Sequence, residues 1–208
     1  MTQGPSSSDS YLALEAEGRA EIREKASRFL AFALSVDSPD EGARAIERLE
    51  RRYHDATHIA FAWKVGTGGG VVTRASDAGE PAGTAGRPIA SAIESSGLTN
   101  VCVAVVRYFG GTKLGTGGLA RAYRAAAASA LTAGGRHEVV ERTEVVIRCP
   151  PERSGAVRRL IRPPEISLIS EQFSESCLFR LAVLRSRLVA LRGALERARL
   201  DYEILPRS

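Results

Sequence analysis

The sequence contains little cysteine and histidine and no long apolar run, and each of these absences argues against a class of protein. Three cysteines, widely spaced and without a C-x-x-C pair, predict reduced, buried thiols rather than a disulfide framework, which points to a cytoplasmic protein. With only three histidines beside them, a structural zinc site is disfavoured, and we expect neither a metal nor a cofactor. No apolar run approaches the roughly 20 residues of a membrane helix, and residues 1–10 lack a signal-peptide pattern, so we expect no membrane partner.

The basic charge is unevenly placed along the chain. The formal net charge is +5, and residues 56–137 contain eight Lys or Arg against three Asp or Glu. Residues 150–208 contain eleven arginines against seven acids. Two basic regions in one small protein favour a polyanionic partner such as RNA. Because only three of the 29 basic residues are lysine, the arginine bias agrees equally well with a GC-rich genome, and both interpretations stay open.

Hydrophobic periodicity divides the chain into two modules. In the first, Ser38 followed by Pro39 is typical of a helix start, with Ser38 as the N-cap. The pattern there predicts strands at residues 27–36, 57–65, 71–75 and 100–107, and helices at residues 39–53, 89–96 and 119–133. The second module reads strand, helix, strand, strand, helix, strand, at residues 143–149, 152–161, 166–173, 177–184, 188–199 and 202–205. This βαββαβ order predicts a ferredoxin-like domain within an α+β fold class.

The polar segment GGRHEVVER, residues 134–142, separates the two modules. We expect a disordered lead-in at residues 1–14, a first domain at residues 15–137 and a second domain at residues 143–206. Each module has its own apolar pattern, and we therefore expect the two domains to fold separately.

The segment VVRYFGGTKLGTGGLARAYRAAAA, residues 105–128, is the most informative stretch of the sequence. A buried strand leads into a glycine-rich loop and then into an alanine-rich helix, and the first turn of a helix offers unpaired backbone amides to an anion. A P-loop is disfavoured because Thr116 stands where its lysine belongs, and a dinucleotide-binding loop would begin directly after the strand. Two interpretations stay open: a general phosphate site, or glycines that only permit positive φ and close packing.

The phosphate interpretation assigns roles to specific residues. Arg107, Lys113 and Arg121 would contact phosphates, and either Tyr108 or Phe109 would stack on a base. The backbone amides of residues 110–118 would complete the site. The candidate residues for binding an anion or RNA are Arg107, Tyr108, Gly110, Gly111, Lys113, Gly115, Thr116, Gly117, Gly118 and Arg121.

The loop SDAGEPAGTAGRP, residues 76–88, contains the candidate catalytic residues Asp77 and Glu80. Their spacing suits an acid–base pair or Mg²⁺ binding, although carboxylates in such loops more often accept hydrogen bonds from turn amides. His54 and His58 resemble part of the zinc-peptidase motif H-E-x-x-H. They straddle a helix end and a strand start, so their rings should diverge, and we expect His58 to be structural.

Two of these segments resemble a known family. SDAGEPAGTAGRPI (residues 76–89) and VVRYFGGTKLGTGGLARAY (residues 105–123) closely resemble the signature segments of the YigZ/Impact family. SRFLAFALSV (residues 27–36) and DATHIAFAWKVG (residues 55–66) are similar to its earlier segments. The resemblance extends over almost the whole chain from about residue 15. It implies a first domain like the second domain of ribosomal protein S5, and a ferredoxin-like second domain like those of translation factor G.

The resemblance also implies a function, which stays an expectation at this point. It suggests a cytoplasmic protein that binds RNA, the ribosome or translation factors and takes part in translational regulation. A protein-interaction module is an alternative, because eukaryotic Impact acts by contact with other proteins. An enzyme that acts on a small phosphorylated substrate is another, because the S5-like fold is shared with small-molecule kinases.

Overall fold

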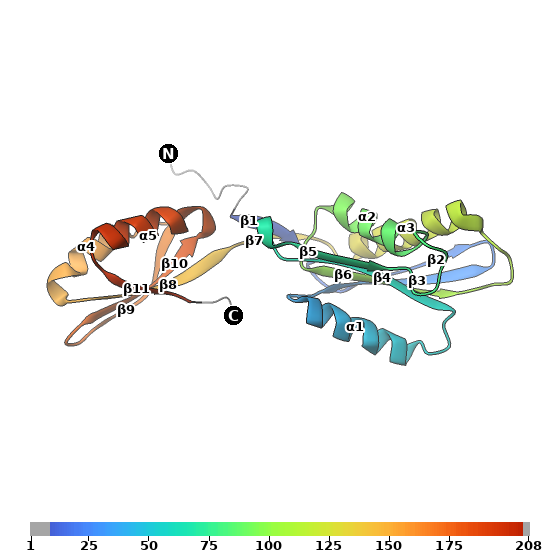
Figure 1. The fold of residues 1–208 in the computed structure, drawn as a ribbon, viewed down its shortest axis with the longest axis horizontal. Coiled ribbons are helices and arrows are strands. Elements are labelled where there is room, and N and C mark those ends of the chain that lie inside the picture. Colours follow the sequence, from blue (N-terminus) through green and yellow to red (C-terminus); the bar gives the residue numbers. More distant parts are fainter. Residues whose placement is uncertain (1–8, 206–208) are drawn as a thin grey trace. The chain divides into compact units, whose positions relative to one another are not determined.

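The computed structural model of the chain describes residues 9–205 and has the expected α+β fold class. The chain divides into two compact units, one formed by Leu12–Glu138 and the other by Met1–Tyr11 together with Val139–Ser208. Figure 1 labels the elements of both units in chain order. Within the described part, no helix combines the length and the apolar character that crossing a bilayer requires.

The larger unit is built on a five-stranded antiparallel sheet with the strand order β2-β3-β6-β4-β5. The strands are β2 (Gly18–Glu24), β3 (Ser27–Ser35), β4 (His58–Val65), β5 (Val72–Ser76) and β6 (Val101–Tyr108), with a 3-10 turn η1 (Gly68–Gly70) between β4 and β5. Helices α2 (Gly86–Ser96) and α3 (Gly115–Ala133) cover one face, and α1 (Pro39–Arg52) covers the other (Figure 1).

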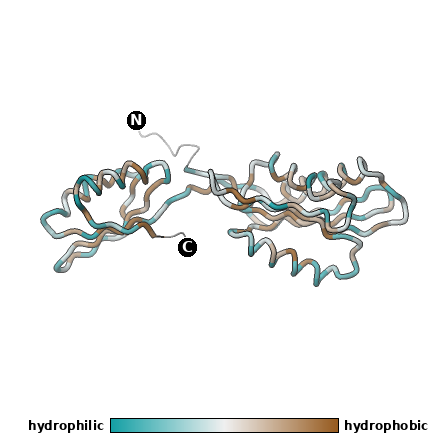
Figure 2. The backbone as a smooth tube through the Cα atoms, viewed as in Figure 1, coloured by the Kyte–Doolittle hydropathy of each residue, from teal (hydrophilic) through white to brown (hydrophobic). Residues whose placement is uncertain are grey.

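The central strand β6 is buried on both faces, and its alternation decides where the residues at its end lie. Val105 packs beneath α2 and α3, whereas Ala104 and Val106 pack beneath α1. Figure 2 shows the hydrophobic residues concentrated in these central strands. Because successive side chains of a strand point to opposite faces, Arg107 falls on the α2 and α3 side and Tyr108 on the α1 side.

Helices α2 and α3 both begin at the same edge of this sheet. β5 and β6 both run antiparallel to β4, so they point in the same direction and end at the same edge. The loop after β5 leads into α2, and the loop after β6 leads into α3, so both helices begin there. We call this edge the helix-start edge.

The smaller unit contains a four-stranded antiparallel sheet with the strand order β11-β8-β10-β9, the order of a ferredoxin-like domain, which confirms the predicted topology. Its elements are β8 (Arg142–Cys149), η2 (Pro151–Arg153), α4 (Ser154–Arg158), β9 (Ile166–Phe173), β10 (Cys177–Leu184), η3 (Arg185–Arg187), α5 (Leu188–Arg197) and β11 (Asp201–Ile204). Its core is its own apolar cluster, with Phe179, Leu181 and Leu195 fully buried. All three cysteines are buried and free, as predicted.

Two expected boundaries differ from the structure. Of the expected disordered lead-in at residues 1–14, residues 1–8 lie outside the described part, but β1 (Ser10–Ala13) is a strand and Leu14 is buried. The polar segment after α3 contains its partner strand β7 (His137–Val140). Both strands were missed because each has only four residues and weak alternation.

Three predicted helices have different limits. α2 begins at Gly86 and α3 at Gly115, earlier than expected, because glycines occupy their first turns and resemble loop sequence. The helix expected at residues 152–161 is only α4, because the chain already turns back toward β9 where the Arg162 amide bonds the Ile166 carbonyl. The start of α1 is confirmed: Ser38 Oγ accepts a hydrogen bond from the Glu41 amide.

Candidate anion-binding site

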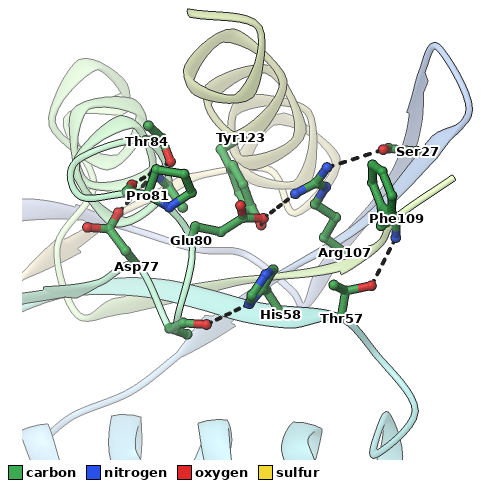
Figure 3. A network of polar contacts seen from close by, with 12 residues as sticks. Ser27, Thr57, His58, Asp77, Glu80, Pro81, Thr84, Arg107, Phe109 and Tyr123 are labelled. Atoms are coloured by element: carbon green, nitrogen blue, oxygen red, sulfur yellow. Dashed lines mark hydrogen bonds and ion pairs between the residues drawn. The ribbon is translucent and has the colours of Figure 1, made fainter. Parts of the chain in front are cut away.

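Asp77 closes the start of α2 at the helix-start edge (Figure 3). Its Oδ1 accepts hydrogen bonds from the amides of Ala85 (2.9 Å) and Gly86 (2.8 Å), and its Oδ2 accepts one from the Gly83 amide (2.8 Å). Partial burial acts to raise the pKa of Asp77, but the three amide hydrogen bonds outweigh it and hold the pKa below its ordinary value. The carboxylate therefore caps α2 although it lies nine residues before the first residue of that helix.

Glu80, Arg107 and Tyr123 form a buried polar cluster (Figure 3). Arg107 Nη1 donates to Glu80 Oε1 at 2.7 Å, and the Tyr123 hydroxyl donates to the same oxygen at 2.7 Å. The side chains of Glu80 and Arg107 are only 2% and 7% exposed. Burial, followed by the hydrogen bond to Glu80, raises the pKa of Tyr123 far above its ordinary value. The cluster ties together the loop before α2, the end of β6 and the first half of α3.

Arg107 is fixed inside the fold, which corrects its expected role as a phosphate contact. Its guanidinium carbon lies 5.6 Å from the ring centroid of Phe29 and 5.5 Å from that of Phe109. Its Nη2 donates to Ser27 Oγ at 3.4 Å, whereas its Nε is buried and bonds no described residue. Because side chains alternate between the two faces of β6, the Arg107 side chain lies beneath α3, where its guanidinium forms an ion pair with Glu80.

Tyr108 lies on the opposite face of the sheet and is likewise unsuited to its expected role. Its hydroxyl donates to Asp55 Oδ1 at 2.9 Å, and its ring packs against the core beneath α1. Partial burial, followed by the hydrogen bond to Asp55, raises the pKa of Tyr108. Phe109, the next residue along the chain, is 45% exposed.

His58 supports the carboxylate loop. Its Nδ1 donates to the carbonyl of Ala78 at 2.9 Å (Figure 3). Gly79 lies against the imidazole ring, where an added Cβ would come within 3.2 Å, and its φ is +86°. The ring therefore has a structural partner, as the sequence predicts, while His54 lies in the turn after α1 with Nδ1 4.0 Å from Asp55.

The glycines of the loop after β6 fall into two groups. A Cβ on Gly110 would lie 1.8 Å from the Ala26 carbonyl oxygen, and Gly111 and Gly115 have φ of +86° and +71°, so packing or backbone conformation requires these three. Gly117 is different, because its φ is not positive and an added Cβ would meet only Arg121 Nη1 at 3.5 Å. Neither sterics nor backbone conformation explains this glycine.

The start of α3 is open, in contrast to that of α2. Its N-cap, Leu114, provides no side-chain hydrogen bond, and residues 115–117 are exposed. The first turn contains no acidic residue, so the partial positive charge of the helix start has no side-chain counterpart there. Thr116 is exposed within this turn, and Gly118 is half-buried against Leu114.

Cations gather at the open start of α3. Lys113 is exposed beside it, and Lys25, from the turn between β2 and β3, donates through Nζ to the Lys113 carbonyl at 3.3 Å. The Arg121 guanidinium lies against Gly117 in the first turn. Cations at a helix start repel the helix dipole, and none of these three has a carboxylate partner within residues 9–205. Open amides and three cations together form a site suited to an anion.

Sequence reasoning missed Lys25 and Tyr123. Lys25 arrives from a turn 88 residues away, for which no local pattern exists. Tyr123 had a signal, because it is the single aromatic residue among the alanines of α3 and lies on its buried side. Of the expected cations, Lys113 and Arg121 lie together at the open start of α3, and Arg107 does not.

Comparisons with known proteins find relatives over most of the chain. Residues 25–131 match the Impact N-terminal domain, a range that includes both loops of the helix-start edge. An IMPACT family member from Thermus thermophilus is 41% identical over 155 residues, which cover 74% of this chain and 83% of that protein. The IMPACT family member YigZ from Escherichia coli (strain K12) is 31% identical over 160 residues, covering 76% and 78%. A crystal structure of a hypothetical protein has a TM-score of 0.66 and 27% identity, and the match covers 96% of this chain and 99% of that chain.

Proposed function

This chain belongs to the Impact family, and from that premise we propose that it binds phosphate groups of RNA within the translation machinery and thereby takes part in translational regulation in the cytoplasm. The observation that carries the proposal is the open first turn of α3, flanked by Lys113, Arg121 and Lys25, none of which pairs with a carboxylate within residues 9–205. Backbone amides and cations of this kind recognise phosphate and carry no sequence information. Phe109 supplies an exposed ring beside them for stacking on a base.

The buried cluster supports binding by holding the site in shape. Glu80 joins the carboxylate loop to Arg107 at the end of β6 and to Tyr123 in α3. The glycine loop lies between Arg107 and Tyr123, so both of its ends are anchored to one carboxylate. A preformed site of this kind loses less conformational entropy when a ligand binds.

An enzymatic role is disfavoured by the state of the two candidate carboxylates. Asp77 accepts three backbone hydrogen bonds, and Glu80 accepts hydrogen bonds from Arg107 and Tyr123 while it is almost fully buried. A general base must reach the proton that it abstracts, and both carboxylates are committed to holding the fold.

The test is co-sedimentation of the protein with ribosomes and with free RNA across a salt series. Lys113→Ala should weaken binding by about 1 kcal/mol, the scale of one charge-assisted hydrogen bond, and should flatten the salt slope by about one unit. Lys113→Arg should restore only part of the affinity, because the planar guanidinium presents its donors differently.

Arg48→Ala is the matched control, because Arg48 is exposed on α1, on the other face of the sheet. It removes the same charge from the protein and should leave binding at the wild-type level. Binding that does not change with salt would refute the phosphate contact and favour a protein partner.

A further inference from the structure

A pocket of about 480 Å³ lies between the last turns of α2 and α3, away from the helix-start edge. Its floor is apolar, with Ala92, Leu98 and Leu131 all buried. Two arginines, Arg124 and Arg136, are among its lining residues, and no acidic residue is. Its volume is in the range of small-molecule sites, and its chemistry combines an apolar surface for a flat ring with cations for a phosphate.

An exposed stripe of α3 joins this pocket to the anion-binding site. Five exposed residues of α3 follow one another at spacings of three or four: Gly117, Arg121, Arg124, Ala128 and Thr132. Residues at these spacings lie on one side of a helix. We call them the α3 stripe. The stripe begins at Gly117, which lies against the Arg121 guanidinium. Its last three residues, Arg124, Ala128 and Thr132, line the pocket.

The charge of this surface has one sign. α3 contains no acidic residue over its 19 residues. Arg121, Arg124 and Arg136 form no ion pair with a carboxylate in the described part of the chain, and Arg124 bonds only the Ser95 hydroxyl, at 3.3 Å. On α2, Glu94 forms an ion pair with Lys64, with 2.9 Å between Oε2 and Nζ. The acid-free surface ends at the pocket's far side, where a Cβ on Gly135 would lie 2.9 Å from the Glu15 carboxylate.

We propose that the α3 stripe and its pocket form a track for single-stranded RNA, which runs from the anion-binding site along α3 and places one base in the pocket. This rests on the proposed function, which it extends from one phosphate to a strand. The stripe from residue 117 to residue 132 is about 22 Å long, room for on the order of four nucleotides. The small side chains between the arginines let the backbone of the strand approach the helix. Arg124 and Arg136 offset the negative end of the helix dipole.

The experiment measures affinity against strand length, with labelled oligouridylates from a dinucleotide to about ten nucleotides at low salt. Wild-type affinity should rise up to about four or five nucleotides and then level off. The double variant Arg124→Ala/Arg136→Ala should bind the longer strands about thirtyfold more weakly, the scale of two lost charge-assisted hydrogen bonds, and should bind the dinucleotide as wild type does. Lys113→Ala should weaken both.

A second variant separates the pocket from general charge. Ala128→Leu fills the pocket without changing charge and keeps a good helix former, so it should weaken only the longer strands. If Lys113→Ala weakens binding while both track variants bind long strands like wild type, the track is overturned and the anion-binding site stands. If the wild type binds neither RNA length at low salt, the proposed function fails together with the track.

Discussion

Gly117→Ala should stabilise the protein and weaken its binding to RNA, an opposition of signs that only a functional glycine produces. Because the φ of Gly117 is not positive and an added Cβ would make an ordinary 3.5 Å contact with Arg121, the methyl group fits without strain. Alanine is favoured over glycine in a helix, so we expect a gain of about 0.5–1 kcal/mol in the free energy of unfolding. The methyl group would separate the Arg121 guanidinium from the first-turn amides, and binding should fall by about 1–2 kcal/mol.

The assay pairs urea unfolding with fluorescence anisotropy of a labelled oligonucleotide at one fixed salt concentration. Gly115→Ala is the backbone control, because its φ of +71° should make alanine destabilising by about 1–2 kcal/mol. Gly110→Ala should destabilise further, since its Cβ would overlap the Ala26 carbonyl. The reasoning is refuted if Gly117→Ala loses more than about 1 kcal/mol of stability, or if its binding curve overlays that of the wild type.

Three further predictions concern the scaffold of the site. Glu80→Ala should lower the free energy of unfolding by about 3–5 kcal/mol, because it leaves the Arg107 charge buried without a partner. Adding Arg107→Met should recover much of that loss. Equal stability of the single and double variants would contradict this reasoning. The pKa of Asp77 is depressed in the folded state, so its contribution is present above about pH 4 and is lost as the pH falls through the folded pKa. In acid titrations followed by circular dichroism, Asp77→Asn should be less stable than wild type at neutral pH, and the difference should shrink toward low pH. A fragment of residues 12–138 should unfold cooperatively in urea, and aggregation of the fragment alone would show that the two units need each other to fold.

The strands and helices with a full apolar period were predictable from sequence, and the features set by distant residues were not. Ser38 and Pro39 mark the start of α1 locally, and the structure has the cap that they predict. The start of α2 has no such local signal, because its cap comes from Asp77 across a loop. Four-residue strands such as β1 exist only through their partners, and no window of sequence reveals the pairing.

The sequence predicts which residues gather near the start of α3, but it does not predict which of them are buried. The glycines and Lys113 indicate an anion site because the pattern of strand, loop and helix is local. Whether Arg107 points to the ligand or to the core depends on which face of β6 lies beneath α3, which the sequence of one strand does not tell. The pairing of Arg107 with Glu80 joins residues 27 positions apart through a sheet and two loops. Composition alone does not distinguish Arg107, which is buried, from Arg121, which lies at the candidate site.

The two helices that begin at the helix-start edge differ in their N-terminal caps, and this difference suggests a structural role for the ligand. α2 carries its own permanent cap in Asp77, whereas the first turn of α3 holds three glycines and its N-cap residue, Leu114, makes no side-chain hydrogen bond to it. A phosphate at α3 would do for that helix what Asp77 does for α2, so the ligand is the missing cap. The amides of residues 115–118 should therefore exchange with solvent quickly in the free protein, where no side chain caps them, and slowly in the complex.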